Sequence, residues 1–412
     1  MKGLLEQAQA YDKSDPLASH QSAFCLPPSV VYLDGNSLGP VSANAKHFLN
    51  ECVEQQWQTD LIGSWNTHQW ITMPQRVGAS LAPLLGAEPH ELISCDSISV
   101  NLFKLLSHIV NSCSERDTVL VQRGNFPTDN YVAQGLAQLT SGRITLKEVD
   151  TADLSRHLDT RVAAVVMSQV NYKTGERYDV ADICEHAHRN GALMLCDLAH
   201  SAGVLKLDLH QLKIDFAVGC GYKFLNGGPG APGFVYVAER HHNHLQPGLT
   251  GWMGHRRPFN FEADYHPAQG VTGLLTGTPP ILSMAALLGA LEDFKGCAME
   301  NLEAKAHALG DFFLTALAEL GIADQLTLIT PTDHARRGAQ LSFEHPEAYG
   351  LCQALIEAGV IGDFRAPRIL RFGFSPLFLS FTDVLRAAEI LQRILASQSY
   401  RDPKYTERKA VT

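Results

Sequence analysis

The fold is decided by residues 192–223, ALMLCDLAHSAGVLKLDLHQLKIDFAVGCGYK. An apolar run lies near each end of this stretch, and each run is typical of a buried strand. Similar runs occur elsewhere, namely TVLVQ, ITLKEV, VAAVVMSQV and GFVYVAE, and helical stretches such as VADICEHAHRNG separate several of them. Strands that alternate with helices predict an α/β fold with a mainly parallel sheet that is covered on both faces.

The 412 residues are enough for two or three domain-sized cores. We expect an N-terminal arm over residues 1–60 that also contributes to the small domain. A large α/β domain should follow over residues 61–290, and a small C-terminal α+β domain over residues 291–412. The helical patterns after Pro280 predict a long helix near residues 280–320 that joins the two domains.

Charge and composition exclude several classes of partner and location for this chain. The net charge of −10 argues against nucleic acid, because phosphate binding needs clustered lysine and arginine. No run of 18 apolar residues predicts a membrane span, and the first residues lack the pattern of a signal peptide. Nine cysteines without a CxxC pair are typical of free thiols in a reducing cytoplasm. The histidines of HHNH, residues 241–244, lack partners at ligand spacing, so we expect no metal site.

Ionisable side chains follow the two apolar runs of residues 192–223. Asp197 ends the first run and His200 comes three residues later, whereas Tyr222 and Lys223 end the second run. In an open parallel sheet, ligands bind at the carboxyl ends of the strands. We therefore expect Asp197 and Lys223 to face the same crevice. The alternative is an ordinary salt bridge between them, or two solvated loop charges.

Two further segments add chemistry at the same edge of the sheet. Ser99 stands just before an apolar helical pattern, where a serine that caps the helix contributes to an anion site. Phe126 and Asp129 follow the predicted strand TVLVQ. A phosphate site, a flat aromatic face, a carboxylate and a lysine are the groups that pyridoxal phosphate requires. Together these residues predict a pyridoxal-phosphate enzyme.

Seven blocks of the sequence resemble one family of such enzymes. In chain order they are YLDGNSLGP, NFPTDNY, CDLAHSAG, GCGYKFLNGGPG, GWMGH, TGTPPIL and LRFGFSPLF, and they extend from about residue 30 to about residue 395. The chain is similar to the kynureninases, which have the fold type I architecture. The resemblance implies hydrolysis of L-kynurenine to anthranilate and L-alanine, with weaker activity on 3-hydroxykynurenine, in tryptophan catabolism and NAD biosynthesis. Composition and periodicity alone indicate only a pyridoxal-phosphate enzyme of unknown reaction.

The resemblance also implies roles for residues in these blocks. Lys223 would bond covalently to the cofactor, Asp197 would hold its pyridinium nitrogen, and His200 would support the cofactor oxygens or that carboxylate. Phe126 would stack on the ring, with Asp129 near the bond to Lys223. The other expected cofactor contacts are Ile98 and Ser99 at the phosphate, and Pro127, Thr128, Ser168, Tyr222, Trp252 and Thr278.

A second group of residues is assigned to the substrate by the resemblance. Arg371, in ILRFGFSP, would bind the substrate α-carboxylate, while Arg365 and Arg368 are competitors on sequence grounds. The other expected substrate contacts are Ser37, Trp65 and Thr278. The last two stand where animal members of the family typically have His and Asn. This difference predicts a preference for kynurenine over 3-hydroxykynurenine.

Catalysis and assembly follow from the same resemblance. The expected catalytic residues are Lys223, Asp197 and Tyr222, with Tyr222 as a proton donor on the ketone side of the substrate. A simple hydrogen bond from Tyr222 to the phosphate is the alternative. Family members form homodimers whose active sites are completed across the interface, so Trp252 and Thr278 would serve the neighbouring subunit.

Three alternative functions use the same cofactor site. A cysteine desulfurase would share Lys223 and Asp197 but needs a mobile nucleophilic cysteine, and Cys352 lies inside the helical pattern YGLCQALIEAG. A transaminase would leave the cofactor as pyridoxamine, so its products from kynurenine would differ. A catalytically silent scaffold would bind the cofactor without responding to kynurenine.

Overall fold

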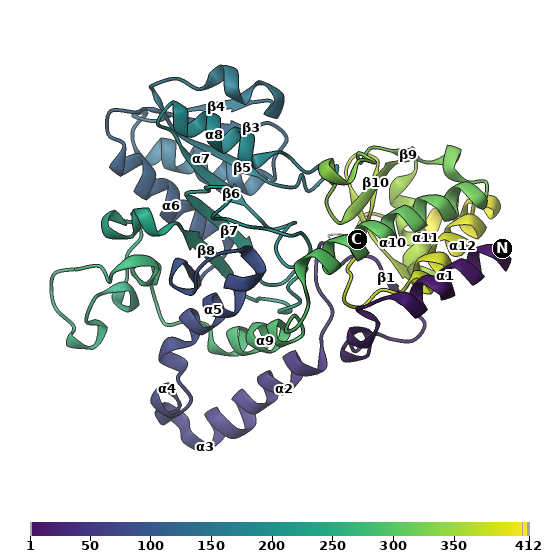
Figure 1. The fold of residues 1–412 in the computed structure, drawn as a ribbon, viewed down its shortest axis with the longest axis horizontal. Helices are drawn as coiled ribbons and strands as arrows, with labels where there is room; N and C mark the ends of the chain where they lie inside the picture. Colours follow the sequence, from purple (N-terminus) through teal and green to yellow (C-terminus); the bar gives the residue numbers. More distant parts are fainter. Residues whose placement is uncertain (1, 406, 410–412) are drawn as a thin grey trace.

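The computed structural model describes residues 2–405 and 407–409. Its centre is a seven-stranded sheet with the strand order β2-β8-β7-β6-β5-β3-β4 (Figure 1). The five strands β3 to β7 run parallel, and β8 runs antiparallel to both β7 and β2. The prediction of an α/β fold with a mainly parallel sheet is confirmed. The strands are β2 Leu92–Ser94, β3 Thr118–Gln122, β4 Thr145–Val149, β5 Val162–Ser168, β6 Leu193–Asp197, β7 Phe216–Cys220 and β8 Gly233–Val237.

Both faces of the sheet are buried at β5, β7 and β8, which explains why these strands are continuous apolar runs, whereas the edge strand β4 is largely exposed. Successive residues of a strand point to opposite faces. Ala164 and Val166 of β5 therefore pack in one apolar core with α6 and α7, whereas Val165 and Met167 pack in another with α5, α8 and α9. These helices are α5 Met73–Leu85, α6 Ile98–Ser112, α7 Pro127–Leu139, α8 Val180–Arg189 and α9 Ile281–Glu292.

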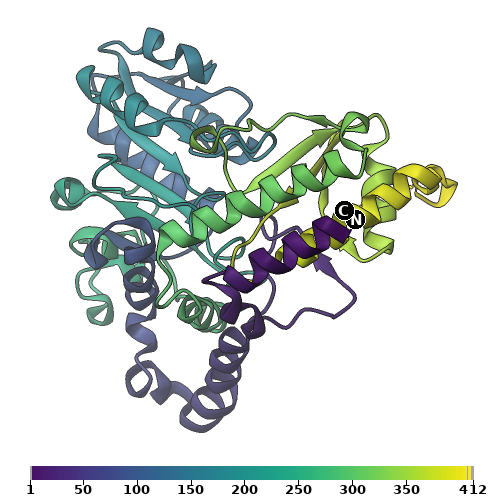
Figure 2. The same cartoon turned by 45° about the vertical axis from the view of Figure 1, so that its right-hand side comes forward.

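A four-stranded antiparallel sheet, with the order β12-β13-β10-β9, forms the centre of the smaller part. The N-terminal segment lies with it, because β1 pairs in parallel with β11 and α1 packs on α12 (Figures 1 and 2). The expected domain boundaries at residues 60 and 290 stay a prediction. The elements are α1 Lys2–Ser14, β1 Val31–Tyr32, β9 Thr327–Leu328, β10 Gln340–Glu344, α11 Ala348–Glu357, β11 Val360–Ile361, β12 Asp363–Arg365, β13 Ile369–Gly373 and α12 Phe381–Ser397.

The long helix expected near residues 280–320 is wrong, because two helices occupy this segment. α9 ends at Glu292 and packs on α2 and α5, whereas α10 Met299–Glu319 packs on α12 of the smaller part. Residues 293–298 form the break, and Gly296 adopts a φ of +81°, a conformation that favours glycine. Apolar residues at helical spacing on both sides concealed this turn.

The remaining α-helices follow β1 and precede α5 in the chain. They lie at the lower edge of the view in Figure 1. They are α2 Ala43–Glu51, α3 Gln58–Asp60 and α4 Ser64–Thr67. Among residues 2–405 and 407–409, no helix combines the length and apolar character needed to cross a bilayer.

Candidate active site

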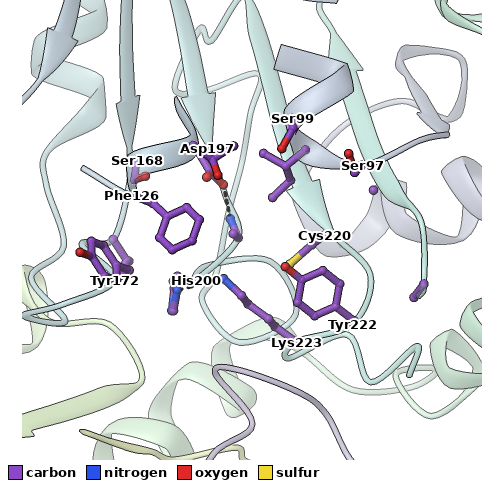
Figure 3. A pocket seen from close by; sticks show the side chains of 16 residues that line it. Ser97, Ser99, Phe126, Ser168, Tyr172, Asp197, His200, Cys220, Tyr222 and Lys223 are labelled. Carbon is purple, nitrogen blue, oxygen red and sulfur yellow. Dashed lines mark hydrogen bonds between the residues drawn. The ribbon is translucent and has the colours of Figure 1, made fainter. Parts of the chain in front are cut away.

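A pocket lies at the carboxyl ends of the parallel strands, where the sequence predicts the site (Figure 3). Its volume is about 130 Å³, close to the ~150 Å³ of a cavity that binds benzene, so one six-membered ring fits. Nine predicted cofactor residues line it: Ile98, Ser99, Phe126, Thr128, Ser168, Asp197, His200, Tyr222 and Lys223. The rest of its lining, which the sequence analysis did not assign, is Ser97, Val170, Tyr172, Ala199, Cys220, Ala231 and Gly233.

Lys223 lies in the turn after β7, which ends at Cys220, and not on the strand itself. Its Nζ is 3.1 Å from Nε2 of His200 and 5.9 Å from the centre of the Phe126 ring. The turn is held from the N-terminal arm, because Gly39 N–H donates to the Tyr222 carbonyl at 2.7 Å. A Cβ on Gly39 would lie 2.5 Å from the Lys223 carbonyl oxygen, so only glycine fits at this contact.

Asp197 ends β6 and is buried beside the pocket. Its Oδ1 accepts a hydrogen bond from Ala199 N–H at 2.7 Å, which fixes the direction of the carboxylate. Burial raises the pKa of Asp197, and the positive charge of Lys223 opposes this effect. No salt bridge between Asp197 and Lys223 is present among the described residues, so the simplest structural alternative for this pair does not apply.

A buried polar chain underlies the aromatic side of the pocket. Ser168 Oγ donates to Asn125 Oδ1 at 2.5 Å, and Asn125 Nδ2 donates to Asp129 Oδ2 at 2.8 Å. Asn125 Oδ1 also accepts from Phe126 N–H at 2.7 Å, which holds the residue that carries the ring. Asp129 is fully buried, and burial followed by repulsion from Asp197 raises its pKa well above the usual range. Asp129 supports the chain from beneath the pocket.

The expected helix N-terminus is present, but its capping residue is Ser97 and not Ser99. α6 begins at Ile98, and Ser97 Oγ accepts a hydrogen bond from Val100 N–H at 3.5 Å. Ser99 lies within the first turn, where backbone N–H groups have no partner inside the helix and attract anions. Gly233 faces this turn, and a Cβ there would lie 3.4 Å from the Ile98 nitrogen. The helix end and the glycine leave room for an anionic group.

The pocket shifts the pKa values of His200 and Tyr222 in opposite directions. Burial, followed by the charges of Lys223 and Arg371, lowers the pKa of His200 well below its usual range, so its ring is neutral. Lys223 Nζ therefore donates to Nε2, and the ring proton is on Nδ1, a buried atom with no hydrogen-bond partner in the part of the chain that the structure describes. Burial, followed by the nearby Cys220, raises the pKa of Tyr222, which keeps its hydroxyl protonated.

Arg371 is the buried one of the three candidate arginines. Its side chain is 1% exposed, whereas Arg368 is exposed and Arg365 is half-buried. Arg371 Nε donates to Asp363 Oδ1 at 2.6 Å, and Nη2 donates to Asp363 Oδ2. Nη1 donates to the carbonyl of Tyr172, a residue of the pocket wall.

Asp363 was missed by the sequence analysis. It stands opposite Arg371 in the pairing of β12 with β13, and Ser37 Oγ donates to its Oδ2 at 2.8 Å. Ser37 Oγ also accepts from Arg371 Nη2 at 3.3 Å. The predicted substrate residues Ser37 and Arg371 thus lie together, and their shared partner depends on a strand register that the sequence does not reveal.

Several predicted residues do not line the pocket of their own chain. Pro127 is the first residue of α7 and flanks Phe126. Trp65 packs edge-on against Trp70 with ring centres 6.0 Å apart. Trp252 is 38% exposed, and Thr278 is exposed as well. Their expected roles at the cofactor or substrate stay predictions.

Comparison with known proteins gives the family. Residues 302–391 match the model of the kynureninase C-terminal domain. Kynureninases from Burkholderia mallei (strain ATCC 23344) and Burkholderia pseudomallei (strain K96243) are each 45% identical over 413 residues, covering 99% of this chain and 99% of the relative. The chain belongs to the kynureninase family. A kynureninase from Pseudomonas fluorescens is 43% identical, and the match covers 98% of both chains.

Solved structures with the same architecture extend beyond the kynureninase family. A cysteine desulfurase from Thermococcus onnurineus NA1 matches with a TM-score of 0.75 at 16% identity, covering 94% of this chain and 98% of that one. The cysteine desulfurase CsdA from Escherichia coli has a TM-score of 0.75 at 18% identity, covering 92% and 98%. A C-DES mutant with glycine covalently linked to its PLP cofactor has a TM-score of 0.74 at 18% identity, covering 88% and 97%. At these identities the likeness shows the fold alone.

Proposed function

We propose that this protein is a hydrolase that cleaves L-kynurenine to anthranilate and L-alanine with pyridoxal phosphate as its cofactor. The observation that carries the proposal is the 43–45% identity to kynureninases over 98–99% of the chain. The grouping of Lys223, Asp197 and Phe126 around one pocket at the N-terminus of α6 supports it.

The residues of the pocket fit pyridoxal phosphate. The first turn of α6, with Ser99 and the space beside Gly233, would hold the phosphate. Phe126 would cover one face of the ring, and Asp197 would keep the pyridine nitrogen protonated. The buried Nδ1–H of His200 would donate to an oxygen of the cofactor, since it meets no acceptor in hydrogen-bond geometry within residues 2–405 and 407–409. Lys223 would hold the cofactor covalently.

The reaction breaks the bond between the β- and γ-carbons of the substrate, next to a ketone. When bound, pyridoxal phosphate supplies an electron sink for negative charge at the substrate α-carbon. Lys223 Nζ would accept the α-proton of the substrate. Nε2 of the neutral His200 ring is 3.1 Å from Nζ, so it would accept a hydrogen bond from Lys223 and orient its amine. Tyr222 is held in its protonated form and would donate a proton during the ketone half of the reaction.

A positively charged group beside the pocket would bind the substrate carboxylate. Arg371 and Arg365 both contact Asp363, and Asp34 lies in the same group. Burial, followed by repulsion from Asp363, raises the pKa of Asp34 to about 7. Below that pH two guanidinium groups face one carboxylate. The net positive charge suits a carboxylate ligand, and Arg371 would bind it by exchanging a contact with Asp363 or with the Tyr172 carbonyl.

A homodimer would explain the predicted residues that lie outside the pocket. Trp252 is stacked on Phe261 and packs edge-on against Phe259, and these three aromatic side chains are between 38% and 77% exposed. Exposed aromatic groups of this kind mark association surfaces. Trp252 and Thr278 would then contact the active site of the neighbouring subunit.

A desulfurase reaction that uses Cys352 is disfavoured by the position of this residue. This thiol is fully buried inside α11, where it cannot move to carry sulfur, and burial raises its pKa. A loop cysteine with a thiolate would be needed for that chemistry.

Product analysis tests the proposal against its rivals. Holoenzyme incubated with L-kynurenine and no keto acid should form anthranilate and alanine in equal amounts. A transaminase would form neither product and would convert its cofactor to pyridoxamine. A silent scaffold would leave kynurenine unchanged. Either of these last results would overturn the assignment.

A further inference from the structure

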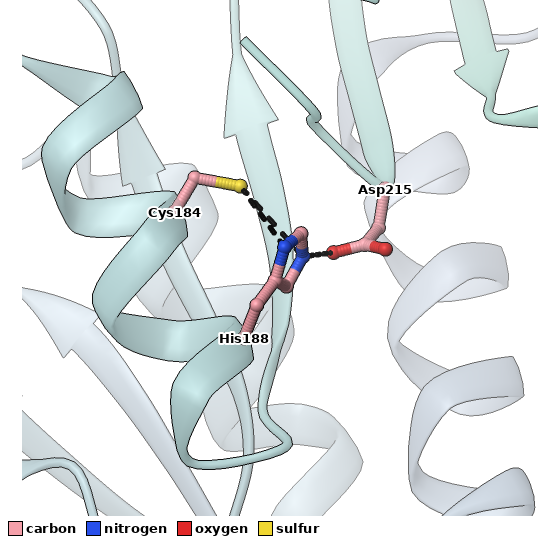
Figure 4. A group of neighbouring side chains, drawn as sticks. All are labelled: Cys184, His188 and Asp215. Atoms are coloured by element: carbon pink, nitrogen blue, oxygen red, sulfur yellow. Dashed lines mark hydrogen bonds and ion pairs between the residues drawn. The ribbon is translucent and has the colours of Figure 1, made fainter.

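Cys184, His188 and Asp215 form a cluster at the opposite end of β7 from Lys223 (Figure 4). Cys184 and His188 are four residues apart on α8, so their side chains lie on the same face of the helix. Asp215 immediately precedes β7. The Sγ atom, an imidazole nitrogen and a carboxylate oxygen all lie within 4.8 Å of one another.

The three side chains have the chemistry of a zinc site. Thiolate, imidazole and carboxylate are its common protein ligands. Zinc bond lengths put tetrahedral sulfur and nitrogen ligands about 3.6 Å apart, and Cys184 Sγ is 3.7 Å from His188 Nε2. His188 Nε2 is 2.7 Å from Asp215 Oδ2, with a proton between them. An ion that replaces this proton needs a separation of about 3.4 Å, so the imidazole and the carboxylate must move apart by about 0.7 Å.

The surroundings hold the carboxylate and leave a route for an ion. Asp215 Oδ1 accepts hydrogen bonds from His241 Nε2 and Arg240 Nη2, each at 2.7 Å. Oδ2 accepts from Met194 N–H at 2.8 Å and is the oxygen that faces His188. Such hydrogen bonds orient metal ligands. His188 is about one-third exposed, which gives solvent access to the cluster.

We propose that Cys184, His188 and Asp215 bind one Zn²⁺ ion, with water as the fourth ligand. Binding would release two protons, the S–H proton of Cys184 and the proton shared by His188 and Asp215. Since the Zn²⁺ ion carries two positive charges, the net charge of the cluster would not change. The ion would link α8 to the beginning of β7, the strand that leads to Lys223. The site is separate from the proposed reaction and does not depend on it.

Sequence spacing gave no sign of this cluster. The HHNH histidines lack ligand partners nearby in the chain, but folding brings His241 to Asp215, which also contacts His188 on α8. The expectation that the chain binds no metal is therefore replaced by a specific proposal for these residues.

Cobalt substitution tests the site in the holoenzyme, because Co²⁺ reports its ligands through absorption. Metal-free holoenzyme titrated with Co²⁺ should bind one equivalent per chain, with visible bands of a four-coordinate ion and an ultraviolet thiolate-to-metal band. Cys184→Ser should lose the thiolate band, and His188→Gln should bind at least about 10-fold more weakly. His186→Gln is the matched control. His186 lies on the same helix, but its ring hydrogen-bonds the backbone carbonyl of Asp182 and not the cluster.

A second measurement separates binding from folding. Zn²⁺ should raise the Tm of the wild type and of His186→Gln but not that of Cys184→Ser, while all metal-free variants should retain the circular dichroism of the wild type. The serine hydroxyl can replace the thiol as a donor to the Lys213 carbonyl, so we expect this variant to fold. Failure of the wild type to bind Co²⁺, or an unchanged thiolate band in Cys184→Ser, would overturn the proposal.

Discussion

Replacing Asp363 tests the account of the carboxylate-binding group most severely. Asp363 is 1% exposed, accepts hydrogen bonds from Arg371 and Ser37, and forms an ion pair with Arg365 Nη2 at 2.8 Å. Burial would raise its pKa, but the hydrogen bond and charge of Arg371 and the charge of Arg365 outweigh burial and hold the pKa below its usual value. Asp363 is therefore ionised at neutral pH, and Asp363→Ala would leave the Arg371 guanidinium buried without its counter-charge.

The expected loss of stability is large for a single substitution. Removing one partner of a buried ion pair costs about 3–5 kcal/mol of unfolding free energy. Loss of the charge-assisted bonds that direct Arg371 should also weaken substrate binding by about 1.5–3 kcal/mol, which raises KM for kynurenine by about 10- to 150-fold. The kcat should change less, because the α-carboxylate takes no part in bond cleavage.

Urea denaturation and steady-state kinetics measure the two effects on the same variant. Glu357→Ala is the control, because its pair with Lys404 is exposed and should matter little. The stability supplied by Asp363 is present above the ordinary carboxyl pKa near 3.8 and is lost as the pH falls through its lower folded pKa, so the variant and wild type should converge only in acid. If Asp363→Ala matched Glu357→Ala in urea midpoint and kept the wild-type KM, the proposed role of this group would be refuted.

Three further predictions concern the pocket and its assembly. The pKa of Asp34 is raised to about 7, so its ionisation at higher pH should neutralise the carboxylate-binding group and raise KM. Asp34→Asn should abolish this rise. An identical pH profile of KM in the variant and the wild type would contradict the prediction. Gly39→Ala should reduce kcat by about 10-fold or more, because its Cβ would displace the Lys223 turn, whereas Gly63→Ala meets nothing within 4 Å and should leave kcat unchanged. Lys223→Ala and Trp252→Ala should each be inactive alone. Mixed dimers of the two variants should regain activity, because one of their two sites combines an intact lysine with an intact tryptophan. No recovery after subunit exchange would argue against a shared site.

Substrate preference gives a separate prediction. The kcat/KM for kynurenine should exceed that for 3-hydroxykynurenine, as the residues at positions 65 and 278 predict. Equal values, or a preference for the hydroxylated substrate, would contradict it. Because Trp65 packs on Trp70 in its own chain, Trp65→His should change the ratio of the two values only if its ring also reaches a substrate.

The sequence predicted those features that depend on local pattern and on the general geometry of parallel sheets. Apolar runs located β6 and β7, and the rule that ligands bind at strand carboxyl ends brought Asp197 and Lys223 together. Helix ends were less certain. Ser97 and Ser99 are both plausible caps by residue type, and only the backbone shows that α6 begins at Ile98.

Features that depend on tertiary contacts were not predictable. Asp363 meets Arg371 only through the register of two short strands. Asn125 connects Ser168 to Asp129 through hydrogen bonds between distant segments. The proposed zinc ligands likewise come from separate elements, since His188 lies on α8 and Asp215, 27 residues later, immediately precedes β7. None of these contacts leaves a periodic signal in the sequence.

The most direct test of the central claim is anthranilate fluorescence after L-kynurenine is mixed with purified holoenzyme. The wild type and Lys206→Ala, a change at an exposed lysine paired with Glu300, should both release anthranilate over many turnovers. Lys223→Ala should release none at a comparable rate. Absence of anthranilate from the wild type, or wild-type turnover by Lys223→Ala, would contradict the assignment.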